Sequence, residues 1–155
     1  MMSIEYIDKI IKLQHFTIIM FAIVISIIDI KTFRISDKIL MLLLSLLIFA
    51  DLFKGLAPVL SNILSAVIIF TIFFAVFHFV GGMGFGDVKY AAVLSYGLGL
   101  KGIYIAMVVT IISSVFLFLV GYFLLGWNKK TKVPFAPLLS VGAISSIIIG
   151  QVICP

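Results

Sequence analysis

Charged residues are scarce in this chain, since Asp, Glu, Lys and Arg together make up 11% of its 155 residues. Hydrophobic residues make up 64%, and the mean hydropathy is +1.38. Soluble domains are roughly 45–50% apolar, and a domain of this length buries only about 70% of its surface on folding. The composition therefore excludes a water-soluble fold. It predicts one all-α, polytopic integral membrane domain over residues 1–155.

Cysteine and histidine are also scarce, which limits the chemistry. The chain has one cysteine, Cys154, and two histidines, so it has no disulfide framework and no zinc-site spacing. It also lacks His-Glu-x-x-His and Gly-x-Ser-x-Gly motifs, which disfavours zinc and serine hydrolases. We therefore predict neither a metal nor another cofactor. The net charge of +5 does not indicate a nucleic-acid partner, because the basic residues gather in short loops between apolar runs.

Long apolar runs divide the chain, and about six of them approach the 20 or so residues that cross a bilayer as a helix. The fourth run is short and ends near Gly97 and Gly99, so five spans plus a re-entrant segment is the alternative. Residues 1–12 carry isoleucines at helical spacing and predict a short interfacial segment before the first run. The six runs are residues 13–30, 39–53, 56–80, 88–100, 102–127 and 134–153.

Basic residues between these runs predict the orientation of the protein. Most of them follow the first, third and fifth runs, so the positive-inside rule places those loops in the cytoplasm and both chain ends outside. We expect a multi-pass protein of the inner (cytoplasmic) membrane, in which these cations set the topology and bind anionic lipid. The cations are Lys31, Arg34, Lys38, Lys89, Lys129, Lys130 and Lys132.

Two aspartates lie against these apolar runs, Asp29 at the end of the first and Asp87 at the start of the fourth. An ionisable side chain in apolar surroundings costs at least a few kcal/mol and by default indicates a functional site. The predicted topology brings both carboxyls to the cytoplasmic face. The helix dipole disfavours an anion at the end of a helix and favours it at the start, so the two carboxyls would hold protons unequally. The structural alternatives are an ion pair of Asp29 with Lys31 or Arg34, and a helix N-cap at Asp87.

Glycines precede the second aspartate, at Gly81, Gly82, Gly84 and Gly86. They permit backbone conformations closed to other residues and a close approach of another chain, such as an extended substrate peptide. Lys89, two residues past Asp87, either stabilises the charged form of that aspartate or marks the lipid boundary.

Three motifs resemble those of a known family. Residues 84–87 match the Gly-x-Gly-Asp signature of intramembrane aspartyl proteases, and residues 82–89 look like the type IV prepilin peptidases in particular. Residues 29–37 resemble that family's first site, an aspartate, a basic loop and Ile-Ser-Asn, with Asp37 in place of the usual asparagine. Residues 134–137 resemble its Pro-Phe-Gly-Pro, with Ala136 in place of glycine.

This resemblance implies an intramembrane aspartic endopeptidase. Asp29 and Asp87 would be the catalytic pair, and Gly82, Gly84, Gly86 and Lys89 would form the site loop. The enzyme would remove the basic leader from type IV prepilins or pilin-like precursors of pili, secretion systems or competence machinery, at the cytoplasmic face of the membrane. The larger members' cysteine-bearing domain and methyltransferase activity are not expected. The oligomeric state stays open.

A different class of function is the alternative. A small proton- or cation-coupled transporter would use the two aspartates as ion sites. It predicts internal repeats among the apolar runs, and the sequence has none beyond a similar run length.

Overall fold

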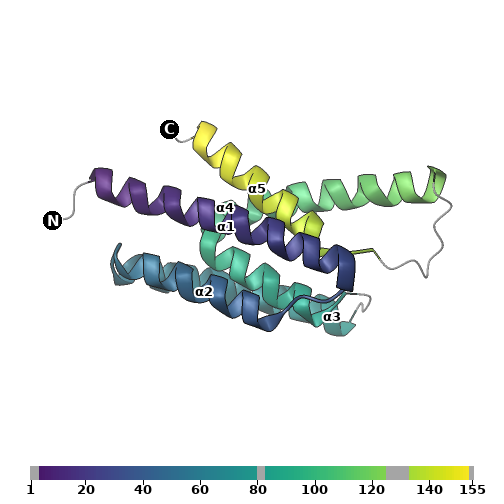
Figure 1. Ribbon diagram of the computed structural model, residues 1–155, viewed down its shortest axis with the longest axis horizontal. Helices are drawn as coiled ribbons and strands as arrows, with labels where there is room; N and C mark the ends of the chain where they lie inside the picture. The colour runs from purple at the N-terminus through teal and green to yellow at the C-terminus, as the bar shows by residue number, and fades with distance from the viewer. Residues whose placement is uncertain (1–3, 80–82, 125–132, 154–155) are drawn as a thin grey trace.

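The computed structural model describes residues 4–79, 83–124 and 133–153, and these residues form five α-helices and no strand (Figure 1). The predicted all-α class is therefore confirmed for this part of the chain. The helices are α1 (Ile4–Thr32), α2 (Asp37–Leu52), α3 (Leu56–Phe79), α4 (Phe85–Leu124) and α5 (Ala136–Ile153).

Three of these helices are long and apolar enough to cross a membrane, namely α1, α3 and α4. The helix α2 has 16 residues and α5 has 18. At 1.5 Å per residue, helices of this size fall short of a hydrocarbon core about 30 Å thick. The prediction of about six transmembrane helices is therefore not confirmed. The short interfacial segment predicted for residues 1–12 is, from Ile4 onward, the uninterrupted start of α1.

The helix α4 contains a break at Gly99, where φ is 66° and ψ is 176°. This left-handed backbone conformation favours glycine, and it interrupts the helical hydrogen bonds enough to turn the chain. Figure 1 shows the teal first part of α4 beside α2 and α3, and the green second part pointing in a different direction. The fourth and fifth apolar runs are thus two parts of one helical element, joined at the glycine.

The core lies around the first part of α4. Val88, Ala91 and Leu94 are buried there, in one apolar cluster with side chains of the other four helices. Gly97 lets α1 come close, because a Cβ at this position would lie 2.7 Å from Ile18 Cδ1. Small residues at such crossings are typical of helices that pack in lipid, where van der Waals contact replaces the hydrophobic driving force.

A buried polar cluster holds three helices together at one end of the bundle. Asp51 of α2 is 1% exposed. Its carboxylate accepts hydrogen bonds from Gln14 Nε2 of α1 (2.7 Å) and Asn62 Nδ2 of α3 (2.8 Å). Lys54 Nζ lies 3.0 Å from the same carboxylate and also donates to the Gln14 side chain. The charge is buried here, yet both carboxylate oxygens are paired.

This cluster predicts a large loss of stability when its carboxylate is removed. We expect Asp51→Ala to lower the free energy of unfolding by about 3 kcal/mol, because it leaves Lys54 buried without its counter-charge. Thermal unfolding in detergent micelles measures this change. Asp8→Ala, at an exposed position of α1, is the matched control and should leave stability unchanged. Equal melting temperatures for the two variants would contradict the role given to Asp51.

Candidate active site

Asp29 lies near the end of α1 and is held by the start of α5. Its side chain is buried, with the residue 5% exposed. The backbone N–H of Ala136 donates to Asp29 Oδ2 at 3.1 Å, across 107 residues of sequence. Ala136 is the first residue of α5, so this N–H is one of the donors that a helix leaves unsatisfied at its N-terminus. The chain turns away directly afterwards, at Phe33, which has a φ of 51° and ends α1.

Asp87 lies in the first turn of α4, with 9% of its surface exposed. The N–H of Gly84 donates to Asp87 Oδ2 at 3.1 Å, and the N–H of Asp87 donates to the Gly84 carbonyl at the same distance. The bond from the Gly84 N–H to the Asp87 side chain is one half of a capping box, with aspartate as the third helical residue, while Gly84 has no side chain to supply the other half. The expected N-cap role of Asp87 is thus partly right, although Gly84 occupies the cap position itself.

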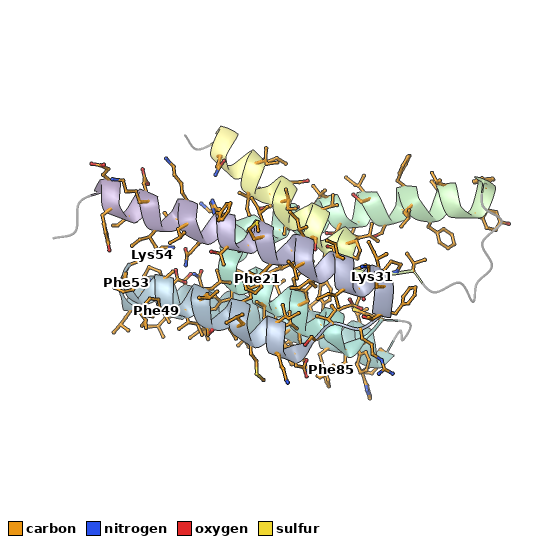
Figure 2. The ribbon with its side chains drawn as sticks, in the orientation of Figure 1. Phe21, Lys31, Phe49, Phe53, Lys54 and Phe85 are labelled. Carbon is orange, nitrogen blue, oxygen red and sulfur yellow. The ribbon has the colours of Figure 1, made fainter. Side chains whose placement is uncertain are left out.

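Both carboxyls lie at the same end of the bundle. Ser140 of α5 lies within hydrogen-bond distance of both Ser26, three residues before Asp29, and Tyr90, three residues after Asp87, so the parts of α1 and α4 that carry the carboxyls are adjacent. Figure 2 labels Lys31 and Phe85, each two residues from one of the aspartates, at the opposite end from Lys54. The aspartate at the end of α1 and the aspartate at the start of α4, far apart in sequence, therefore lie in the same region of the molecule.

The sequence predicts that Asp29 and Asp87 hold protons unequally, and the position of α5 reduces the difference between their surroundings. From the sequence, Asp29 lies at the negative end of the α1 dipole. In the structure, the positive end of α5 faces the same carboxylate through Ala136. Asp87 in turn lies at the positive end of α4. Each carboxylate is therefore next to a helix N-terminus, which favours an anion at both positions.

A hydrogen-bonded layer lies one helical turn beneath the aspartates. Ser140 of α5 is within 2.8 Å of both the Tyr90 hydroxyl of α4 and Ser26 Oγ of α1. Ser140 also donates to the backbone carbonyl of Ala22 at 3.2 Å. Tyr90 follows Asp87 by three residues and Ser26 precedes Asp29 by three, so these side chains share the faces that carry the carboxyls. The layer joins the three helices that build the site.

The glycines before Asp87 have distinct surroundings. A Cβ at Gly86 would lie 3.2 Å from the Cβ of Ile35, so the first turn of α4 packs closely against the α1–α2 connection. A Cβ at Gly84 would lie 3.2 Å from Asp87 Oδ2, on the side of the capping hydrogen bond. Gly82 and Gly81 lie outside the described residues. At Gly86 the close neighbour is thus this chain's own loop, and the approach of a substrate peptide to these glycines stays a prediction.

Lys89 does not pair with Asp87. Its Nζ donates to both oxygens of Asp37, at 2.9 Å and 2.8 Å, and lies 5.0 Å from the ring centroid of Phe85. In the described part of the chain, the ion pairs are Glu5 with Lys9, Asp51 with Lys54, and Asp37 with Lys89. The alternative reading of Asp29 as an ion-pair partner of a loop cation is therefore not supported.

The arrangement is suited to general acid–base chemistry. Each carboxyl has one oxygen fixed by a backbone N–H, and among the described residues the second oxygen has no protein donor. Two such groups in range of one another are able to share a proton and hold a water molecule between them. Across the described ranges, no group of three or more His, Cys, Asp or Glu residues comes together as a metal site.

Sequence reasoning missed the parts of the site that come from helix packing. In the sequence, Ala136 only replaces a glycine of the motif at residues 134–137. The position of that motif at the start of a helix is the feature that could have predicted the hydrogen bond from Ala136 to Asp29. Tyr90 and Ser140 carried no motif, although their spacing from Asp87 and Ala136 puts them on the right faces.

Comparison with known proteins gives one match. A model of the type IV leader peptidase family matches residues 16–124, which include Asp29 and Asp87 and end before α5. No curated protein and no solved structure matches the chain.

The layer beneath the aspartates predicts a measurable role for one hydroxyl. We expect Tyr90→Phe to lower the free energy of unfolding by about 1 kcal/mol, because the ring stays in place while the hydrogen bond to Ser140 is lost. Denaturant unfolding in detergent measures the change. Tyr104→Phe is the matched control, since Tyr104 is 71% exposed, and it should have no effect. A Tyr90→Phe variant as stable as the control would show that the hydrogen bond contributes nothing.

Proposed function

Because this chain belongs to the type IV leader peptidase family, whose members are aspartic-type peptidases, we propose that Asp29 and Asp87 are its catalytic pair. The observation that carries the proposal is a pair of buried carboxyls from α1 and α4 at one end of the bundle, each anchored by an N–H at the start of a helix and above a shared hydrogen-bonded layer. In a membrane protein, buried carboxyls of this kind are kept for a function.

The reaction uses the pair as one acid and one base. The ionised carboxyl takes a proton from water, and the water oxygen bonds to the carbonyl carbon of the scissile peptide. The protonated carboxyl gives its proton to the carbonyl oxygen. Collapse of the tetrahedral intermediate breaks the C–N bond, and the amine leaves with a proton from the pair. The two carboxyls titrate as a unit, so the protons belong to the pair rather than to either residue.

The exposed surface at the start of α4 is suited to binding an extended peptide. Gly84 and Phe85 are exposed, and Gly86 is partly exposed, directly before the buried Asp87. A peptide backbone that lies on glycine comes closer than side chains would permit. An extended substrate that crosses this surface would bring the carbonyl group of its scissile bond within reach of the aspartates.

The substrates we propose are type IV prepilins or pilin-like precursors, cut between a basic leader and the apolar segment that follows. The chain is a membrane protein with apolar spans, and we place its active site at the cytoplasmic face of the inner membrane. Two observations support this side. Lys31, Arg34 and Lys38 lie at the α1–α2 connection, where positive-inside charges belong. In Figure 1 the beginning of α1 and the end of α5 lie on the left, away from that connection on the right.

Substitution of either aspartate tests the pair. When the protein is co-expressed with a prepilin, we expect Asp29→Asn and Asp87→Asn each to lower the rate of leader removal by about 10³-fold or more, because asparagine neither gives nor takes a proton. Loss of the leader is followed by the mobility shift of the pilin on a gel, with mass spectrometry to locate the cut.

Asp8→Asn, an equivalent change at an exposed position, should cleave like the unmodified protein. Cleavage that survives either active-site substitution would exclude a catalytic pair. If the unmodified protein cuts no pilin-like precursor but conducts protons across vesicles, the two aspartates are ion sites and the peptidase proposal is wrong.

A further inference from the structure

The α1–α2 connection, residues 33–36, starts directly after the helix that carries Asp29. Hydrogen bonds fix its first residues on the last turn of α1. The N–H of Phe33 donates to the backbone carbonyl of Asp29 at 2.8 Å, and the N–H of Arg34 donates to the Thr32 hydroxyl at 3.3 Å. The connection is therefore anchored on the same turn of α1 that holds the first aspartate.

The other end of this connection contacts the first turn of α4 at two places. A Cβ at Gly86 would lie 3.2 Å from the Cβ of Ile35, so the backbone of α4 leaves no room for a side chain there. Two residues further along, Asp37 accepts a hydrogen bond on each oxygen from Lys89 Nζ, at 2.9 Å and 2.8 Å. One short piece of chain is thus attached to both of the helices that carry the aspartates.

The ion pair lies on the side of α4 away from Asp87, because residues two apart on a helix point about 200° apart. Lys89 Nζ also lies 5.0 Å from the ring centroid of Phe85, and the ring of Phe85 lies 5.6 Å from that of Phe77 in α3. Asp37 is the first residue of α2, where the helix dipole favours its charge. The pair therefore supports the first turn of α4 from behind without touching the carboxyl of Asp87.

We propose that Asp37 and Lys89 are positioning residues, and that their ion pair fixes Asp29 and Asp87 relative to one another through the α1–α2 connection. The inference rests on the proposed function, in which the two carboxyls share a proton and one water. The layer around Ser140 joins α1 and α4 one turn deeper, and the connection joins them at the level of the carboxyls. Catalysis by a pair of groups is sensitive to small displacements, so loosening this contact lowers the rate of the chemical step.

Kinetics on a prepilin substrate in detergent test the ion pair. Asp37→Ala and Lys89→Met should each lower kcat about threefold to fivefold with KM unchanged, the upper range for a partly exposed ion pair. The double variant should lose no more than either single variant, because both remove the same contact. Lys89→Arg should keep kcat, since a guanidinium also reaches both oxygens of a carboxylate. Glu5→Ala, which removes an exposed acid of another ion pair from the first turn of a helix, is the matched control and should keep kcat.

The pH profile separates positioning from a direct effect of charge on the aspartates. Asp37→Ala removes a negative charge and Lys89→Met removes a positive one, so a direct effect would shift the pH profile of kcat in opposite directions. Positioning predicts the same loss of kcat in both variants, with the pH profile unmoved. Opposite shifts, or a higher KM with kcat unchanged, would overturn the proposal.

Cross-linking gives a second measurement that needs no peptidase activity. In a chain with Asp29→Cys, Asp87→Cys and Cys154→Ser, a short bifunctional thiol reagent reports how often the two positions meet. Adding Asp37→Ala should slow the intramolecular cross-link about threefold, in the range of one partly exposed ion pair, while reaction with a monofunctional reagent stays the same. An unchanged rate of cross-linking would mean that the ion pair does not position the aspartates.

These outcomes are distinguishable from a failure of the proposed function. If the unmodified protein cuts no prepilin, the peptidase assignment itself is wrong, and cross-linking still decides whether the ion pair sets the geometry. If the protein cuts a prepilin and depends on Asp29 and Asp87, but Asp37→Ala keeps the full kcat, only the positioning proposal is overturned.

Discussion

A buried carboxylate in an apolar protein requires a hydrogen-bond donor, and for Asp29 and Asp87 the donors are N–H groups at the starts of helices. Ala136 supplies one to Asp29, and Gly84 supplies one to Asp87. The position of α5 therefore matters as much as that of the two helices that carry the aspartates. The layer of Ser26, Tyr90 and Ser140 fixes α5 against both of them.

Buried aspartates at the two ends of the bundle have different hydrogen-bond partners. At the far end, Asp51 has a lysine and two amide donors, so its charge is fully compensated and serves the fold. At the candidate site, each aspartate has one backbone donor and keeps an oxygen for another partner. A fully satisfied polar cluster rigidifies a structure, whereas a partly satisfied one has capacity for chemistry. This difference separates Asp29 and Asp87 from the remaining buried acid.

Much of the fold, and the position of two aspartates at the ends of apolar helices, were accessible from the sequence, since both depend on local properties. The apolar runs locate α1, α2, α3 and α5 within a few residues, apart from the longer start of α1. The energetic penalty of charge in lipid singles out Asp29 and Asp87. The contacts of Ala136 with Asp29 and of Lys89 with Asp37 were not predictable, because spacing defines the faces of one helix but not which neighbour each face meets. For the same reason the Asp51 cluster was missed, and Gly99 joined two predicted spans into one broken helix.

The central claim is that Asp29 and Asp87 meet in one site. It is tested most directly by cross-linking in native membranes, with cysteine at both positions and Cys154 replaced by serine. The account predicts that a short bifunctional thiol reagent links Cys-substituted positions 29 and 87 within the chain, and does not link positions 53 and 87, since the exposed Phe53 lies at the opposite end of the bundle. The account would be contradicted if both cysteines at 29 and 87 react with a monofunctional reagent of the same chemistry and yet no cross-link forms.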